Sequence, residues 1–198
     1  MLNVFAGIPP SEPVPDWGRM TGADDAAARM AERLAEDERA LSLAGCRAEN
    51  LGLLDSQYRD GPADVVLGVP DGAAVLAPAG IGGHSDHEAV RDAALGLGGE
   101  TALYAELPYA TEFGWPAWLT GDEPDPFRDV DAYWSQFVPD GFDARPVELD
   151  EGQQRRKIEA MRAYRTQFSM LEGGPLRRLT HAELVRFEVL FERSNGSG

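Results

Sequence analysis

The sequence predicts an α/β fold, a three-layer sandwich around a mostly parallel sheet. Short apolar runs of β-type composition alternate with amphipathic segments, which favours parallel strands joined by crossover helices. The chain has 198 residues, a length that suits one domain. Its hydrophobic fraction of 43% is sufficient for a buried core. These observations exclude a wholly disordered chain.

The first part of the chain is predicted to form a strand, a loop and a helix. Residues 2–6 are a short apolar run, and the prolines between residues 9 and 15 exclude a helix or a central strand directly after it. Gly45 is well placed to end the helix predicted over residues 24–45. In that segment apolar side chains recur at helical spacing among charged ones, at Ala27, Met30, Leu34 and Leu41.

The middle of the chain contains three more strand candidates and a second helix. Residues 50–54 and 73–77 are strand candidates, and a glycine-rich loop follows the second of them. A helix is then expected over residues 84–97, and the next strand over residues 101–107. In sheets of this kind ligands bind beyond the carboxyl ends of the strands. The glycine-rich loop is therefore a candidate site.

The last part of the chain is predicted to form a long connection followed by helices. Residues 109–146 are rich in proline, tryptophan and acidic side chains, which indicates a lid or wall with short helical turns. Helices are expected over residues 155–168 and from Thr180 through Phe191. We expect residues 1–193 to form a single domain and residues 194–198 to form a disordered tail.

Composition limits the classes of partner. The chain has 18 Lys+Arg against 34 Asp+Glu, a formal net charge of −16, which argues against nucleic acid and anionic membrane surfaces. No apolar run approaches the roughly 20 residues that span a bilayer. Cys46 is the only cysteine, so internal disulfides are excluded and the cytoplasm is the expected location. The scarcity of lysine beside abundant arginine, alanine and glycine suggests a GC-rich, bacterial source.

The histidines carry the strongest chemical signal. Two of the three, His84 and His87, lie in one polar loop with Asp86 between them. An H-x-D-H cluster at a strand-to-helix junction can offer one imidazole to a metal, another to a reacting group, and a carboxylate to orient a ring. A solvated loop with incidental histidines is an equally simple interpretation. Two histidines cannot complete a zinc site, since catalytic zinc usually takes three protein ligands.

A longer stretch around these histidines resembles a known family. The run from Ala74 to His87, followed by Val90-Arg91-Asp92, is similar to the second motif of the PIG-L/LmbE-like zinc-dependent de-N-acetylases. Further segments resemble the same family, so the likeness covers most of the chain: Val4-Phe5-Ala6-Gly7, the acidic helix, Asp55 with Tyr58-Arg59, Leu107-Pro108-Tyr109-Ala110 and Tyr164-Arg165-Thr166-Gln167. The resemblance implies a Rossmann-like sandwich.

The resemblance also implies an activity and site residues. His87 would be a zinc ligand, His84 a catalytic imidazole near the tetrahedral intermediate, and Asp86 the group that orients an imidazole. A zinc-activated water would attack an acetamide carbonyl and release acetate and a free amine. The expected partner is a small N-acetylated sugar or glycoside.

The sequence also departs from the family. A His-Pro-Asp-Asp motif, which in the family follows the first strand and supplies two zinc ligands and the base, is missing, and residues 2–6 correspond to the second strand. Three explanations are open: a start codon further upstream, an inactive relative that acts as a binding or regulatory protein, or a site completed by another chain or by Asp16, Asp24 or Asp55. Loss of a strand would expose backbone and apolar surface, so a homo-oligomer is one expectation.

The remaining candidates each have two interpretations. Asp55, Tyr58 and Arg59 could bind sugar hydroxyls, or they could stabilise a turn. Tyr109, Phe113, Trp115 and Trp118 could line a carbohydrate pocket and bind substrate, although simple packing is the favoured interpretation of these aromatic residues. The acids on the helix over residues 24–45 are interpreted as solvated surface: Glu32, Glu36 and Asp37.

Overall fold

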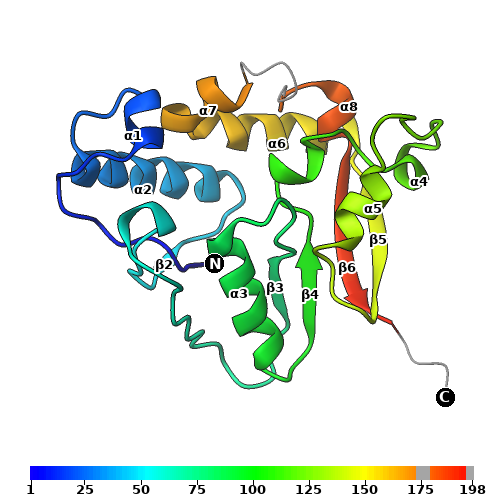
Figure 1. Ribbon diagram of the computed structural model, residues 1–198, viewed down its shortest axis with the longest axis horizontal. Coiled ribbons are helices and arrows are strands. Elements are labelled where there is room, and N and C mark those ends of the chain that lie inside the picture. Colours follow the sequence, from blue (N-terminus) through cyan, green and yellow to red (C-terminus); the bar gives the residue numbers. More distant parts are fainter. Residues whose placement is uncertain (173–178, 195–198) are drawn as a thin grey trace. The chain divides into compact units, whose positions relative to one another are not determined.

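The computed structural model describes residues 1–172 and 179–194. The chain divides into two compact units, each made of two separate stretches (Figure 1). Unit 1 comprises residues 1–63 and 151–180, and unit 2 comprises residues 64–150 and 181–198. The mixed α/β class is confirmed. The three-layer Rossmann-like arrangement, the missing first strand and the single domain over residues 1–193 stay predictions.

Unit 1 contains a short parallel strand pair. Strand β1 (Leu2–Asn3) pairs with β2 (Glu49–Asn50), so both predicted strands exist but are shorter than expected. Main-chain bonding continues past their ends, because the N–H of Gly7 donates to the carbonyl of Leu53 at 2.9 Å. The loop after β1 contains helix α1 (Asp16–Met20), and a 3-10 turn, η1 (Ser56–Tyr58), follows β2.

Helix α2 (Ala26–Leu43) confirms the predicted amphipathic helix. The side chain of Asp25 caps its start by accepting the N–H of Ala28 at 2.8 Å. After its end, Gly45 adopts a left-handed φ of +67°, the conformation that favours glycine at this position. Met30 is among the buried residues of the apolar face.

The interpretation of the α2 acids as solvated surface is wrong for Glu36, which is only 2% exposed. Helix α6 (Glu151–Ala163) is followed by helix α7 (Arg165–Glu172), where a single helix over residues 155–168 was expected. One carboxylate oxygen of Glu36 accepts the N–H of Thr166 at 3.0 Å and the other accepts its hydroxyl at 2.7 Å. Asp37 accepts the hydroxyl of Tyr164 at 2.7 Å. The burial is tolerated because these donors satisfy the carboxylates.

Unit 2 is built on a mixed four-stranded sheet in the order β3-β4-β6-β5. Strands β3 (Val75–Pro78) and β4 (Thr101–Tyr104) are parallel and joined through α3 (Ser85–Gly96), as predicted (Figure 1). Strands β5 (Phe142–Glu148) and β6 (Phe187–Arg193) run antiparallel to their neighbours. Parallel pairing is therefore confirmed only for part of the expected sheet.

The helix expected after Thr180 is wrong beyond its first turn. Helix α8 (Ala182–Val185) is followed directly by strand β6. Phe187, Val189 and Phe191 alternate with less buried neighbours along this strand. Because positions 184, 187 and 191 fit a helical period as well, the sequence pattern was ambiguous.

The connection over residues 109–146 contains the expected short helical turns, namely η2 (Tyr109–Thr111), α4 (Ala117–Thr120) and α5 (Val130–Ser135). Its tryptophans mainly pack: Trp115 and Trp134 are buried in the core of unit 2, whereas Trp118 is 46% exposed. Strand β5 was missed because charged residues and Pro146 interrupt its pattern, and it lies at a sheet edge, where proline is tolerated. The predicted tail falls almost entirely outside the described residues.

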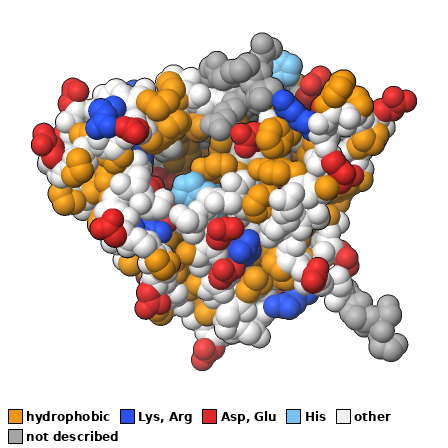
Figure 2. Space-filling view, in the orientation of Figure 1, with side chains coloured by type: hydrophobic (Ala, Val, Ile, Leu, Met, Phe, Trp, Pro, Cys, Tyr) orange, Lys and Arg blue, Asp and Glu red, His pale blue; other side chains and the backbone are white. Residues whose placement is uncertain are grey.

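On the face shown in Figure 2, Asp and Glu side chains are scattered among hydrophobic and uncharged ones, and Lys and Arg side chains appear only at separated places. Such a surface offers nucleic acid no extended basic patch on this face. In the described part of the chain, no helix is both long and apolar enough to cross a bilayer.

Candidate functional site

The candidate site in unit 2 lies where the parallel strands β3 and β4 end. The loop from Ala79 to His84 follows β3, and Glu106 follows β4. Arg91 on α3 holds this loop, because its Nη1 donates to the carbonyls of Ala79 and Phe137, both at 3.2 Å. The predicted location of a site beyond the carboxyl ends of the strands therefore contains the histidine cluster.

His84 is the N-cap residue of α3. Its Nδ1 accepts the backbone N–H of Asp86 at 3.3 Å. An imidazole nitrogen can accept only through a lone pair, so this contact places the proton of the neutral ring on Nε2. The fold therefore presents His84 as a ring whose Nε2–H can donate a hydrogen bond.

His87 lies within the first turn of α3, and its Nδ1 donates a hydrogen bond, whereas Nδ1 of His84 accepts one. Its Nδ1 is 3.1 Å from Oε1 of Glu106. Since a carboxylate can only accept, Nδ1 is the donor and the lone pair of the neutral ring is on Nε2. Glu106 is 5% exposed, and its second oxygen accepts the N–H of Ala79 at 3.2 Å. This buried carboxylate fixes both the orientation and the tautomer of His87.

Tyr109 completes the cluster. The ring centroids of His84 and His87 are 4.8 Å apart, and the Tyr109 centroid lies 5.8 Å from the first and 5.3 Å from the second. The Tyr109 ring meets the His87 ring edge-on, at an interplanar angle of 89°. Gly82 permits this approach, because a Cβ at that position would lie 2.9 Å from Cδ1 of Tyr109.

Gly82→Ala tests this packing. Gly82 has a φ of +91°, so alanine there would cost about 1–2 kcal/mol for the backbone and would also clash with Tyr109. Gly98→Ala is the matched control, because Gly98 has a φ of +69° and no atom lies within 4 Å of the place that a methyl group would take. Thermal unfolding should show a larger loss for Gly82→Ala than for Gly98→Ala. Equal losses would contradict the close approach of Tyr109.

Asp86 is also in the first turn of α3 and is 3% exposed. Its backbone N–H binds His84, whereas the carboxylate that bonds to His87 belongs to Glu106. Its assignment as the group that orients an imidazole stays a prediction. Sequence reasoning missed Glu106, although a signal existed: an acid at the end of an apolar strand needs a buried partner.

The other three predicted residues lie together in unit 1. Asp55 accepts the N–H of Gln57 at 3.0 Å, and Arg59 donates to the carbonyl of Leu54 at 2.7 Å. The Arg59 guanidinium also lies 4.7 Å from the centre of the Phe5 ring. These contacts stabilise a turn, which was one of the two interpretations. Sugar binding by Asp55, Tyr58 and Arg59 stays a prediction.

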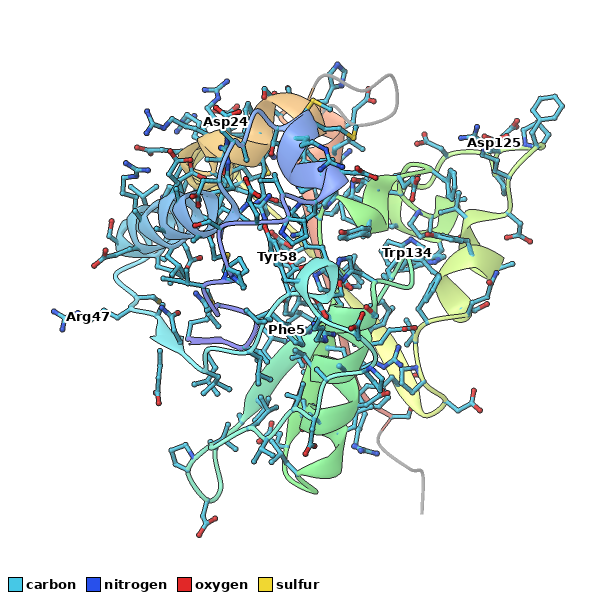
Figure 3. The ribbon with its side chains drawn as sticks, turned by 60° about the vertical axis from the view of Figure 1, so that its left-hand side comes forward. Phe5, Asp24, Arg47, Tyr58, Asp125 and Trp134 are labelled. Carbon is cyan, nitrogen blue, oxygen red and sulfur yellow. The ribbon has the colours of Figure 1, made fainter. Side chains whose placement is uncertain are left out.

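Tyr58 is labelled near Phe5 in Figure 3, at the end of η1. Burial raises the pKa of the Tyr58 phenol above its ordinary value, and the nearby positive charge of Arg33 acts in the opposite direction. The phenol therefore keeps its proton at neutral pH and can donate a hydrogen bond.

The described residues do not by themselves fit a catalytic zinc. His87 offers one imidazole lone pair, whereas Nδ1 of His84 is used as a helix cap. Across residues 1–172 and 179–194, no three His, Cys, Asp or Glu side chains gather as a metal site. A catalytic zinc usually takes three protein ligands, so His87 would need partners beyond this cluster.

Comparison with known proteins supports the fold. No protein-family model matches the sequence, and no curated protein matches it. A deacetylase–bog complex from the biosynthesis pathway of teicoplanin has 26% sequence identity and a TM-score of 0.66, covering 99% of this chain and 87% of that chain. The zinc-inhibited form of teicoplanin deacetylase Orf2 has 24% identity and a TM-score of 0.63, covering 99% and 88%.

A third solved structure has a fold similar to that of this chain. The A40926 pseudoaglycone deacetylase Dbv21 has 23% identity and a TM-score of 0.64, covering 96% of this chain and 83% of that chain. All three neighbours are deacetylases, and one of them is described with zinc as an inhibitor. The chain thus shares nearly its whole length with a deacetylase fold.

Proposed function

We propose that this chain removes an N-acyl group, acetyl in the simplest case, from an amino sugar carried by a glycoside. The observation that carries the proposal is the pair of neighbouring imidazoles, His84 and His87, whose Nδ1 atoms contact a backbone N–H and the Glu106 carboxylate respectively. The deacetylase fold shared with a 26%-identical neighbour supports the same reaction class.

The two rings can perform the two proton transfers of amide hydrolysis. The lone pair on Nε2 of His87 can bind a metal or accept a proton from the attacking water, and Glu106 stabilises the ring in either role. The Nε2–H of His84 can donate to the oxyanion or to the departing nitrogen. Water adds to the acyl carbon, the C–N bond breaks, and a carboxylate and a free amine result.

A second function is favoured by the incomplete metal site. A protein with this fold could bind the N-acylated sugar without hydrolysing it, as a binding or regulatory protein. The observation behind this alternative is that no three His, Cys, Asp or Glu side chains gather as a metal site among the described residues. Both functions place the sugar at the histidine cluster. The deacylase would hydrolyse it, whereas the binding protein would not.

A deacylation assay on the purified full chain separates the two functions. p-Nitrophenyl N-acetyl-β-glucosaminide and teicoplanin serve as probes, with and without added zinc, and mass spectrometry detects loss of an acyl group. The proposal expects the free amine to appear, with the metal content of the protein measured in parallel. Binding of either probe by calorimetry with no amine under any metal condition would overturn hydrolysis and establish the binding protein.

A further inference from the structure

Arg91 follows His87 by four residues, so both side chains lie on one side of α3, one turn apart. The Arg91 side chain is 15% exposed. Its Nε donates to Asp92 at 2.9 Å, but Asp92 is 66% exposed, so this ion pair contributes little stability. Its Nη1 donates to the carbonyls of Ala79 and Phe137, both at 3.2 Å. Arg91 is therefore a largely buried cation that binds the main chain of two separate segments of unit 2.

The main chain of Ala79 links Arg91 to the carboxylate of Glu106. Ala79 is completely buried, and its carbonyl accepts from Arg91. Its N–H donates to Oε2 of Glu106 at 3.2 Å and to the carbonyl of Tyr104 at 2.8 Å. Oε1 of Glu106 lies 3.1 Å from Nδ1 of His87. A continuous series of contacts thus connects the Arg91 guanidinium with the His87 ring.

The guanidinium also packs directly against the glycine-rich loop. Gly80 has a φ of +80°, and a Cβ there would lie 3.0 Å from Nη1 of Arg91. Phe137 brings the connection over residues 109–146 to the same loop, because its Cε1 would lie 3.5 Å from a Cβ at Gly83. Since the carbonyl of Phe137 accepts from Arg91 as well, one side chain fixes the loop both to α3 and to this connection.

Arginine has the donor geometry that these contacts need. Its guanidinium is a planar fork with five N–H donors, whereas lysine carries a compact ammonium group on a flexible stem. Without Arg91, the buried carbonyl of Ala79 would lose its charged donor, and the loop would have to shift to regain one. A shift of Ala79 would displace the N–H that binds Oε2 of Glu106. A carboxylate that binds a histidine fixes the orientation and the tautomer of its ring.

We propose that Arg91 is a positioning residue for His87 and acts through Ala79 and Glu106. It holds the Glu106 carboxylate in the place where it selects the Nδ1–H form of the His87 ring, and this form keeps the lone pair on Nε2. The inference rests on the proposed function for its effect on turnover. Its effect on the ring is independent of turnover.

NMR of the full chain labelled with nitrogen-15 histidine tests the effect on the ring. At about pH 8 an ordinary histidine ring is neutral, and long-range proton–nitrogen spectra then distinguish the Nδ1–H form from the Nε2–H form. His87 should show the Nδ1–H form in the unchanged chain and a mixture of both forms in Arg91→Met. His181, which lies on α8, should give the same spectrum in both proteins. Substitution of each histidine in turn assigns the signals.

Steady-state deacylation tests the effect on turnover. Arg91→Met should lower kcat by about 10–100-fold, the loss typical when a group that orients a functional histidine is removed, with a smaller change in KM. Arg91→Lys keeps the charge and should fall between Arg91→Met and the unchanged protein. Arg145→Met is the matched control, because Arg145 is an exposed arginine of unit 2 that pairs with Glu192 at 2.7 Å. It should leave both kcat and the His87 spectrum unchanged.

A double-mutant cycle separates positioning from a purely structural role. Once Glu106→Gln has weakened the link to His87, the further loss of Arg91 should have little additional effect on the ring. The kcat of the double variant should therefore lie within about threefold of that of Glu106→Gln alone. A structural role of Arg91 predicts instead that the two losses multiply, because each would act independently of the other.

Three results would contradict the positioning role of Arg91. They are an unchanged His87 tautomer in both Arg91→Met and Arg91→Lys, losses that multiply in the cycle, or an equal loss in Arg145→Met. If Arg91→Met does not fold, the ring spectrum of Arg91→Lys decides the question. Failure of the unchanged chain to deacylate, alongside an altered His87 ring in the Arg91 variants, would count against the proposed function and leave the positioning role standing.

Discussion

Replacement of Trp134 by alanine is expected to lower the free energy of unfolding by about 3–5 kcal/mol. The side chain is 3% exposed, and its indole N–H donates to the carbonyl of Ala110 at 3.1 Å inside the core. Its ring meets those of Trp115 and Phe191 edge-on, with centroids 5.8 Å and 6.0 Å away. Alanine would leave a large cavity and an unpaired buried carbonyl, and both effects destabilise unit 2.

Urea denaturation followed by near-ultraviolet circular dichroism measures this loss. Trp118→Ala is the matched control, because Trp118 also contacts the Trp134 ring but is 46% exposed. The control should cost about 1 kcal/mol or less, since little of its area leaves water. Figure 3 labels Trp134 among the packed side chains of this unit. Similar losses for the two variants would show that Trp134 is not central to the core.

His84→Ala is expected to slow deacylation by about 10²–10⁴-fold, and His87→Ala by at least as much. In the proposed reaction, His84 would supply the Nε2–H, and His87 would supply the lone pair that binds a metal or accepts the proton of water. If His87 binds zinc together with ligands beyond this cluster, His87→Ala should retain less zinc than His84→Ala. The measurements are steady-state rates on an N-acetylglucosaminide and elemental analysis of the purified proteins.

His181→Ala is the control for these two variants. Its side chain is 52% exposed, and it lies at the start of α8 without a side-chain cap bond. Rate and metal content should match those of the unchanged protein. If His84→Ala and His87→Ala kept equal zinc and full activity, the assignment of chemistry to this cluster would be wrong.

The sequence predicts those parts of the fold that depend on local patterns. Helix α2 could be predicted with its final glycine, because apolar spacing and Gly45 both act over a few residues. The β3-α3-β4 unit followed from the same kind of signal. Strand β6 could not be predicted, because its apolar spacing fits two periods and its pairing with β4 and β5 decides between them.

Some contacts could not be predicted because they join residues that are far apart in the sequence. Glu36 and Thr166 are 130 residues apart, and Glu106 lies 19 residues from His87. A carboxylate in an apolar pattern signals that a partner exists but not which one. The H-x-D-H spacing therefore located His84 and His87, whereas Glu106, which binds His87, became visible only in the fold.

The interleaved order of the two units has a consequence for synthesis on the ribosome. Unit 1 needs residues 151–180 to close, and the sheet of unit 2 needs β6 between β4 and β5. Neither unit can finish folding while the chain is still being extended through its middle. The nascent polypeptide thus carries two unfinished cores at once, a period in which exposed apolar surface favours aggregation. Chaperone binding and the speed of late translation should therefore affect the yield of this protein.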